Sequence, residues 1–201
     1  LIYFTFLQKS VIILFIKEKK FMEKNNTKKL SRKCVYIIYF FLFAFMGWAM
    51  ETFYCAYEMG YFSKRGFLYG PICPIYGYGA LILIIILSKY RKSSFKLFVY
   101  SIIIFTVFEY IVSFGLDALF GLKWWDYSER FLNLNGRISI FHSFAWGFIA
   151  ILFINHIYPF VKKHVNIILS KIPHKLQIAI ISVIGTVFIA DTVLSCIRYI
   201  I

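Results

Sequence analysis

Five stretches of the chain are almost free of charged side chains and are long enough to cross a lipid bilayer. They run from about Cys34 to Tyr57, Pro71 to Leu87, Phe95 to Leu119, Ile138 to Phe160 and Leu176 to Ile200. A helix crosses the bilayer core with about 20 apolar residues, and in lipid its backbone amides must find partners within the protein. The sequence therefore predicts an all-α, polytopic transmembrane helix bundle of about five spans.

The composition agrees with this fold class. Of 201 residues, 61% are hydrophobic and only 16% are charged, whereas in a soluble domain roughly half are apolar and about a quarter are charged. A water-soluble globular fold is excluded on these grounds. Five spans use most of the length, so we expect one transmembrane domain over residues 34–201 and no separate catalytic domain.

The positive charge is distributed in alternation along the predicted connections. The net charge of +14 would suggest nucleic acid as a partner in a soluble protein. Here eight Lys and Arg residues lie in 17–33, four in 89–96 and four in 161–175, against two and three in the other two connections. Because cytoplasmic loops are enriched in Lys and Arg, we expect the N-terminus inside and the C-terminus outside. The expected partner of these charges is the lipid bilayer, not nucleic acid.

Residues 1–33 form a basic segment before the first span. Its first part has too short an apolar run for a confident span and lacks the basic start and cleavage site of a secretory signal. We interpret residues 1–21 as an upstream extension before a start at Met22, because Lys17 and Glu18 can be encoded by a purine-rich stretch that resembles a ribosome-binding site. The alternative is a short amphipathic or sixth hydrophobic segment.

No motif points to catalysis by this chain alone. The cysteines and histidines lack the spacing of a metal site, so we assign no metal and no cofactor. Buried free thiols are the expected state of the cysteines, although Cys55 and Cys73 could form a disulfide at the outer face. The sequence contains no phosphate-binding loop and no nucleophile elbow. Any energy source is therefore expected to come from a partner or from a gradient.

Four acidic residues fall within the predicted spans, namely Glu51, Glu109, Asp117 and Asp191. Charged groups are costly in hydrocarbon, so they usually face the bundle interior and often carry function. Glu109, Ser113 and Asp117 are spaced by four residues and share one helix face. We expect Asp117 to cap its helix and Asp191 to pair with Arg198 or to reach outward. The deeper carboxyls of Glu51 and Glu109 are the better functional candidates.

The two predicted outer connections are rich in glycine, proline and aromatic residues. In the first, over 63–79, Gly66, Gly70 and Pro71 favour a backbone that folds back into the membrane plane. In the second, over 120–137, the paired Trp124 and Trp125 are typical of an interfacial aromatic belt. Asn135 is expected to cap the fourth span.

Two helix N-termini are expected to converge at the outer face, with Arg65 and Arg137 beside them, and this arrangement attracts an anion. A structural alternative stays open, in which Glu51 and Glu109 pair with these arginines and pin the loops to the bundle. The candidate substrate-binding residues are Glu51, Arg65, Tyr69, Glu109, Trp125, Asp126, Asn135 and Arg137.

Several strings in the chain resemble a known family. They are Gly47-Trp48-x-x-Glu51, RGFLYGPICPIYG over 65–77, Glu109-Tyr110-x-x-Ser113, WWDYS over 124–128 and NLNGR over 133–137. In this order, from about Phe40 to Pro159, they resemble the bacterial membrane proteins labelled Putative ABC-transporter type IV, or putative ABC transporter permease. The resemblance implies a small multi-pass protein of the bacterial cytoplasmic membrane. Residues 1–33 lie outside it.

Three function classes fit these observations. The first is a permease or permease-like component that handles a small, anionic solute from the outer face, uses a separate ATPase subunit and forms a homodimer to complete its pathway. The second is an extracytoplasmic-face substrate-capture or sensor subunit. The third is an enzyme of lipid or cell-envelope metabolism with Glu51 or Glu109 as general base. The permease is the main expectation.

Overall fold

A computed structural model describes residues 30–63 and 65–201. The segment 1–29, with the predicted start at Met22, and Lys64 lie outside the described residues. The helices and strands are, in order, α2 (Arg32–Met59), α3 (Pro74–Ile82), the π-helical η1 (Leu83–Leu87), the 3-10 turn η2 (Ser88–Tyr90), α4 (Ser94–Phe120), β1 (Asn133–Leu134), β2 (Ile138–Ser139), α5 (Ile140–Leu152), the π-helical η3 (Phe153–Ile157), α6 (Tyr158–Lys171) and α7 (His174–Ile200).

Four helices among the described residues are long and apolar enough to cross a membrane. They are Arg32–Met59, Ser94–Phe120, Ile140–Lys171 and His174–Ile200, and the apolar helix Pro74–Tyr90 is shorter. These helices confirm the prediction of an all-α membrane helix bundle. Three of these helices begin and end within two residues of the predicted first, third and fifth spans. The helix Ile140–Lys171 begins within two residues of the predicted fourth span but ends later.

The fourth span is longer than predicted. The sequence suggested a connection over 161–175, but the helix continues to Lys171. Two features keep it helical. The π-helical turn η3 precedes Pro159, which lies in the first turn of α6 where a missing amide donor costs little. Val161 and Val165 are then buried four residues apart while Lys162 is exposed, so the segment is amphipathic and packs as a helix.

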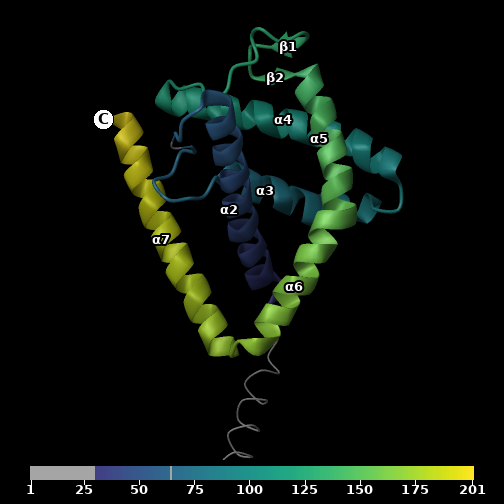
Figure 1. The fold of residues 1–201 in the computed structure, drawn as a ribbon, viewed down its shortest axis with the longest axis vertical. Helices are drawn as coiled ribbons and strands as arrows, with labels where there is room; N and C mark the ends of the chain where they lie inside the picture. The colour runs from purple at the N-terminus through teal and green to yellow at the C-terminus, as the bar shows by residue number, and fades with distance from the viewer. Residues whose placement is uncertain (1–29, 64) are drawn as a thin grey trace, which may run out of the picture.

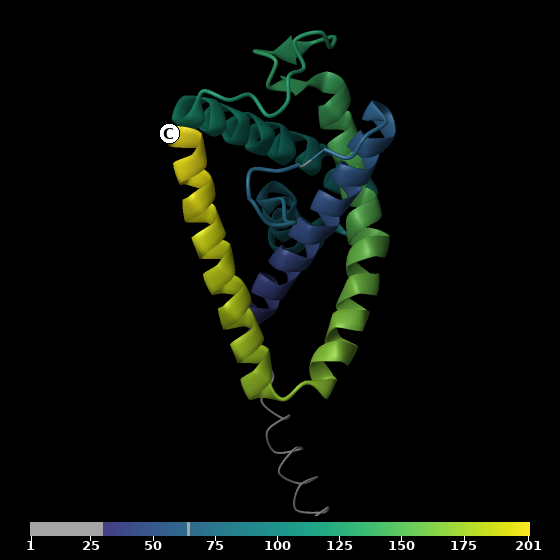
Figure 2. The same cartoon turned by 60° about the vertical axis from the view of Figure 1, so that its left-hand side comes forward.

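The helices are not parallel to one another. In both views α3 and α4 run across the long axis of the molecule, whereas α2, α7 and the rod made by α5 and α6 run closer to it (Figures 1 and 2). The most extensive helix contacts are between α2 and α3 and between α4 and α5. Glu51 lies in the first pair, on α2, and Glu109 lies in the second, on α4.

The α2–α3 pair is held at close range by glycine. A Cβ at Gly77 would lie 2.7 Å from Cδ2 of Phe40 and 2.8 Å from its carbonyl oxygen. The amide of Cys73 donates to the carbonyl of Ala44 on α2 over 3.0 Å, and Leu68 in the preceding loop is only 1% exposed. The loop after α2 therefore packs against α2, and its predicted position in the membrane plane stays a prediction.

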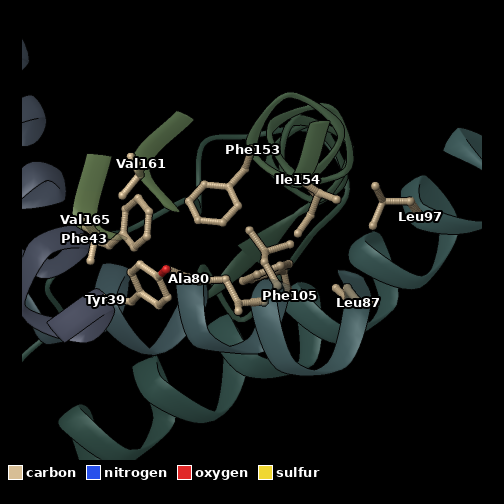
Figure 3. Close-up of a cluster of buried hydrophobic side chains, with 13 residues drawn as sticks. Tyr39, Phe43, Ala80, Leu87, Leu97, Phe105, Phe153, Ile154, Val161 and Val165 are labelled. Carbon is tan, nitrogen blue, oxygen red and sulfur yellow. The ribbon is translucent and has the colours of Figure 1, made fainter. Parts of the chain in front are cut away.

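One apolar core joins side chains from α2, α3, η1, α4, α5, η3 and α6 (Figure 3). Tyr39 and Phe43 of α2, Ala80 of α3, Phe105 of α4 and Phe153 of η3 belong to it. Helix α7 contributes little to it. Large apolar side chains elsewhere are exposed on the helix surfaces, as expected of a protein whose outer face contacts lipid.

Candidate functional site

Glu109 is the most deeply buried carboxyl among the candidate residues, at 5% exposure. It lies on α4 at the contact with α5. Tyr127 donates its hydroxyl to Oε1 over 3.1 Å, and the indole Nε1–H of Trp146 donates to Oε2 over 3.2 Å. Both carboxyl oxygens are thus satisfied by neutral donors.

Tyr127 reaches Glu109 from the connection between α4 and α5. Its ring stacks on His142 at the start of α5, with ring centroids 3.9 Å apart. Burial, and then the nearby carboxyl of Glu109, raise the pKa of the Tyr127 phenol above its ordinary value. The phenol therefore remains a neutral donor over the physiological range.

Glu51 lies on the other helix pair but opens toward the same region. It is half-buried on α2 and lies near enough to the Cys73 thiol and the Tyr76 hydroxyl to interact with both electrostatically. Tyr76 in turn lies close enough to Tyr127 for the two hydroxyls to interact electrostatically. We call Glu51, Tyr76, Tyr127, Glu109 and Trp146 the Glu51–Glu109 cluster.

The predicted pairing of Glu51 and Glu109 with Arg65 and Arg137 is wrong. Nη2 of Arg137 contacts Oδ2 of Asp117 at 2.6 Å, and Nη1 donates to the carbonyl of Ser113 over 3.1 Å. Ser113 and Asp117 lie one and two turns beyond Glu109 on the same face of α4, so they meet the returning loop first. Among the described residues, neither carboxyl of the Glu51–Glu109 cluster forms an ion pair with Lys or Arg.

Trp125 and Asn135 organise the connection that carries Tyr127. The Trp125 indole donates to the carbonyl of Arg137 over 2.9 Å. The sequence suggested that Asn135 caps the fourth span. This is wrong, because Ser139 is the N-cap of α5. Asn135 and Gly136 both have positive φ angles, 55° and 68°, and turn the chain between β1 and β2. Asn-Gly is the preferred pair for such a turn.

Asp126 points into its own loop and not toward Glu109. Its Oδ1 accepts from the Ser128 hydroxyl over 2.5 Å and from the Ser128 amide over 2.9 Å. These hydrogen bonds, with the ammonium of Lys123 at 3.9 Å, hold the pKa of this exposed carboxyl below its ordinary value. Asp126 therefore shapes the loop.

Tyr69 belongs to a separate contact between the first loop and α7. Oδ1 and Oδ2 of Asp191 accept from the amides of Tyr69 and Gly70, both over 2.8 Å. Arg198 lies over the Tyr69 ring, 4.3 Å from its centroid, and donates to the carbonyl of Phe67 over 2.9 Å. The expected ion pair between Asp191 and Arg198 is replaced by bonds from both residues to the loop.

Arg65 has a weak set of contacts. Its Nη2 lies 3.5 Å from the sulfur of Met59, and its buried Nε has no hydrogen-bond partner among the described residues. The structure thus brings Glu51 and Glu109 into one cluster, places Trp125, Asn135 and Arg137 beside it, and leaves Asp126, Tyr69 and Arg65 apart from it.

Three members of the cluster were not candidates from the sequence. Tyr76 and Trp146 lie within apolar helices with no polar neighbour in sequence to mark them, and Tyr127 was indistinguishable from an interfacial aromatic. The four cysteines, for their part, are free thiols.

The arrangement offers two carboxyls, phenol hydroxyls and aromatic rings in the interior of a membrane bundle. Such a site can bind a ligand that brings hydrogen-bond donors or positive charge. The described residues contain no group of three or more His, Cys, Asp or Glu side chains placed to hold a metal ion.

Comparison with known proteins gives one family match. The model of the family described as Putative ABC-transporter type IV matches residues 38–196, which includes most of α7, where no sequence motif had been identified. Among curated proteins and among solved structures, none matches this chain. The match spans most of the 201 residues, from the first turns of α2 to the last turns of α7. The chain belongs to the Putative ABC-transporter type IV family.

Proposed function

We propose that this protein is the permease or permease-like component of an ABC-type transporter in a bacterial cytoplasmic membrane, and that the Glu51–Glu109 cluster binds its solute. The family supports the transporter class. The environment of Glu109 supports this location for the site: the side chain is 5% exposed, and among the described residues its carboxyl accepts hydrogen bonds only from Tyr127 and Trp146.

A carboxyl in that environment is a costly structural element. Burying a charge without a partner of opposite sign costs several kcal/mol, on the order of the penalty seen for charged groups in hydrocarbon. A purely structural acceptor for Tyr127 and Trp146 could be a neutral amide at lower cost. A carboxyl at this position is therefore better explained by a ligand or a proton that it binds.

The charge of the solute follows from the neighbouring groups. The sequence predicts an anion held by Arg65 and Arg137, and this stays a prediction. In the geometry at hand, Arg137 is occupied by Asp117 and Ser113, and the amide of His142 at the start of α5 faces the Ser139 hydroxyl. Two carboxyls flanked by aromatic rings are better matched to a small solute with a protonated nitrogen or several hydroxyl donors.

The remaining parts of the proposal come from the sequence. The chain contains no phosphate-binding loop, so a separate ATPase subunit would supply the energy. The positive-inside distribution of Lys and Arg supports an outer position for the loop that carries Tyr127. We propose on that basis that the solute enters from the outer face. A homodimer, which would enlarge the pathway, stays a prediction.

Comparative metabolite profiling of a deletion strain and its parent would first identify the solute class. Uptake of the solute is then measured in the deletion strain carrying wild type, Glu109→Gln or Glu58→Gln. Glu58 is an exposed residue near the end of α2 and serves as the matched control. We expect uptake to require an ATPase gene and to stay unchanged in Glu58→Gln. In Glu109→Gln we expect uptake to fall at least tenfold, which corresponds to a loss of about 1.4 kcal/mol of binding free energy.

Other outcomes would assign the protein elsewhere. Normal uptake by Glu109→Gln, at equal membrane abundance, would remove the cluster from the transport pathway. Solute binding without any ATPase-dependent accumulation would indicate a capture subunit, and a changed lipid profile restored only by wild type would indicate an enzyme.

A further inference from the structure

A second site lies at the opposite end of the bundle from the loop that carries Tyr127. A pocket of about 440 Å³ opens between the beginning of α2 and the first half of α6. Figure 1 shows where these two helix segments lie. Its lining residues are Leu30, Arg32, Val35, Tyr36, Tyr39, Tyr158, Lys162 and Asn166. No acidic side chain is among them, and the two cations, Arg32 and Lys162, are both exposed.

One hydroxyl in the pocket is accessible and has no hydrogen-bond partner among the described residues. Tyr39 is 2% exposed as a residue and lines the pocket, but its hydroxyl oxygen is not one of the fully buried polar atoms that lack a partner. The hydroxyls of Tyr36 and Tyr158 lie near enough to interact with it electrostatically, and the Tyr158 ring meets the Tyr39 ring edge-on at 5.6 Å. An accessible hydroxyl without a protein partner can donate a hydrogen bond to a ligand oxygen.

The available donors define the ligand chemistry. Arg32 offers a planar guanidinium fork, Lys162 an ammonium, and the three tyrosines offer neutral hydroxyls. Lys162 is kept at this position by the Tyr158 ring, with its Nζ 5.8 Å from the ring centroid. A pocket lined by several hydrogen-bond donors and by no carboxylate suits the oxygens of a phosphate ester.

The surroundings of the pocket indicate a lipid as the source of that phosphate. Neighbouring positions on α6 expose large apolar side chains to the bilayer, including Phe160 at 65% and Ile168 at 56%. More cations lie at the same end, at Lys33 and Lys163. Basic pockets between membrane helices near the cytoplasmic face bind anionic lipid headgroups, with the acyl chains along the apolar surface.

We propose that this pocket between α2 and α6 binds the phosphate-bearing headgroup of an anionic phospholipid. Arg32 and Lys162 contact the phosphate at the mouth, and the Tyr39 hydroxyl donates to one of its oxygens from the floor. The site is independent of the Glu51–Glu109 cluster and would stand even if that cluster bound no solute.

The test uses the full chain purified in mild detergent. Binding of phosphatidylglycerol is measured by native mass spectrometry and by the rise in unfolding temperature. Phosphatidylcholine, inorganic phosphate and glycerol 3-phosphate are the comparison ligands. The variants are Tyr39→Phe, which removes only the hydroxyl, and Lys162→Gln, with Lys163→Gln as control. Lys163 is adjacent and exposed but does not line the pocket.

We expect phosphatidylglycerol to bind and both Tyr39→Phe and Lys162→Gln to weaken it about tenfold each, the effect of losing one hydrogen bond to a charged group. Lys163→Gln should change binding less than twofold. If Lys162→Gln and Lys163→Gln weaken binding equally while Tyr39→Phe has no effect, only surface charge attracts the lipid and the site is refuted. Equal stabilisation by inorganic phosphate or glycerol 3-phosphate would assign the pocket to a soluble phosphate compound instead of a lipid.

Discussion

Replacing Glu109 tests whether the carboxyl is held by two neutral donors. In Glu109→Ala, the Tyr127 hydroxyl and the Trp146 indole N–H lose their acceptor. Each unsatisfied buried donor costs about 1–3 kcal/mol. Because alanine and glutamine both remove the same buried charge, the alanine variant should be less stable than Glu109→Gln by about 2–6 kcal/mol, before any loss of packing is added.

Glu109→Gln should behave differently. The indole of Trp146 can only donate, so the glutamine carbonyl oxygen must face it, while the Tyr127 hydroxyl can rotate and accept from the amide nitrogen. Both hydrogen bonds survive, but they are no longer charge-assisted. The weaker hydrogen bonds lower the stability by about 1 kcal/mol per bond. The neutral side chain also no longer has the desolvation cost of a buried charge, which raises the stability. We expect Glu109→Gln to lie within about 1 kcal/mol of wild type.

The measurement is unfolding of the purified protein in mixed micelles, titrated with a denaturing detergent and followed by circular dichroism. Glu58→Ala is the control, because Glu58 accepts from Tyr54 on an exposed part of α2 over 2.5 Å. Exposed substitutions of this kind change stability by about 0.5 kcal/mol or less. Equal stability of Glu109→Ala and Glu109→Gln would refute the described hydrogen bonds.

Three further outcomes are expected. Gly77→Ala should cost about 1–3 kcal/mol in the same titration, because its Cβ would overlap Phe40; an unchanged midpoint would contradict the close α2–α3 packing. Asp191→Asn should speed hydrogen exchange at the two loop amides that the carboxylate holds, and unaltered exchange would remove that contact. The lowered pKa of Asp126 means that its stabilisation of the loop is present above the ordinary carboxyl pKa and is lost as pH falls through the lowered value. Protection of the Ser128 amide should fall with it, and an equal fall in Asp126→Asn would show another cause.

The helices were predictable from the sequence because their signal is local. A run of about 20 apolar residues with almost no charge indicates a membrane-spanning helix by itself, without knowledge of the rest of the chain. The helix end at Lys171 was missed because basic residues dominate the composition there, while Val161 and Val165 continue the buried face. Asn135 was assigned as a cap by its residue type, but the Asn-Gly pair satisfies a turn equally well.

The candidate site was predictable only in part. Helical spacing correctly placed Glu109, Ser113 and Asp117 on one face of α4, since that relation depends on one helix alone. The choice of Asp117 as the partner of Arg137 depends on where the loop returns. Distances between helices decide such contacts, and no single segment encodes them.

The most direct test of the Glu51–Glu109 cluster is a double-mutant cycle with Glu51→Gln and Glu109→Gln, measured by detergent-induced unfolding. The two residues lie on different helices, α2 and α4. Residues that share partners show coupling of about 0.5–3 kcal/mol, whereas independent sites add within about 0.3–0.5 kcal/mol. We expect a coupling above 0.5 kcal/mol, since the two carboxyls are connected through Tyr76 and Tyr127. Additive effects would contradict a shared cluster.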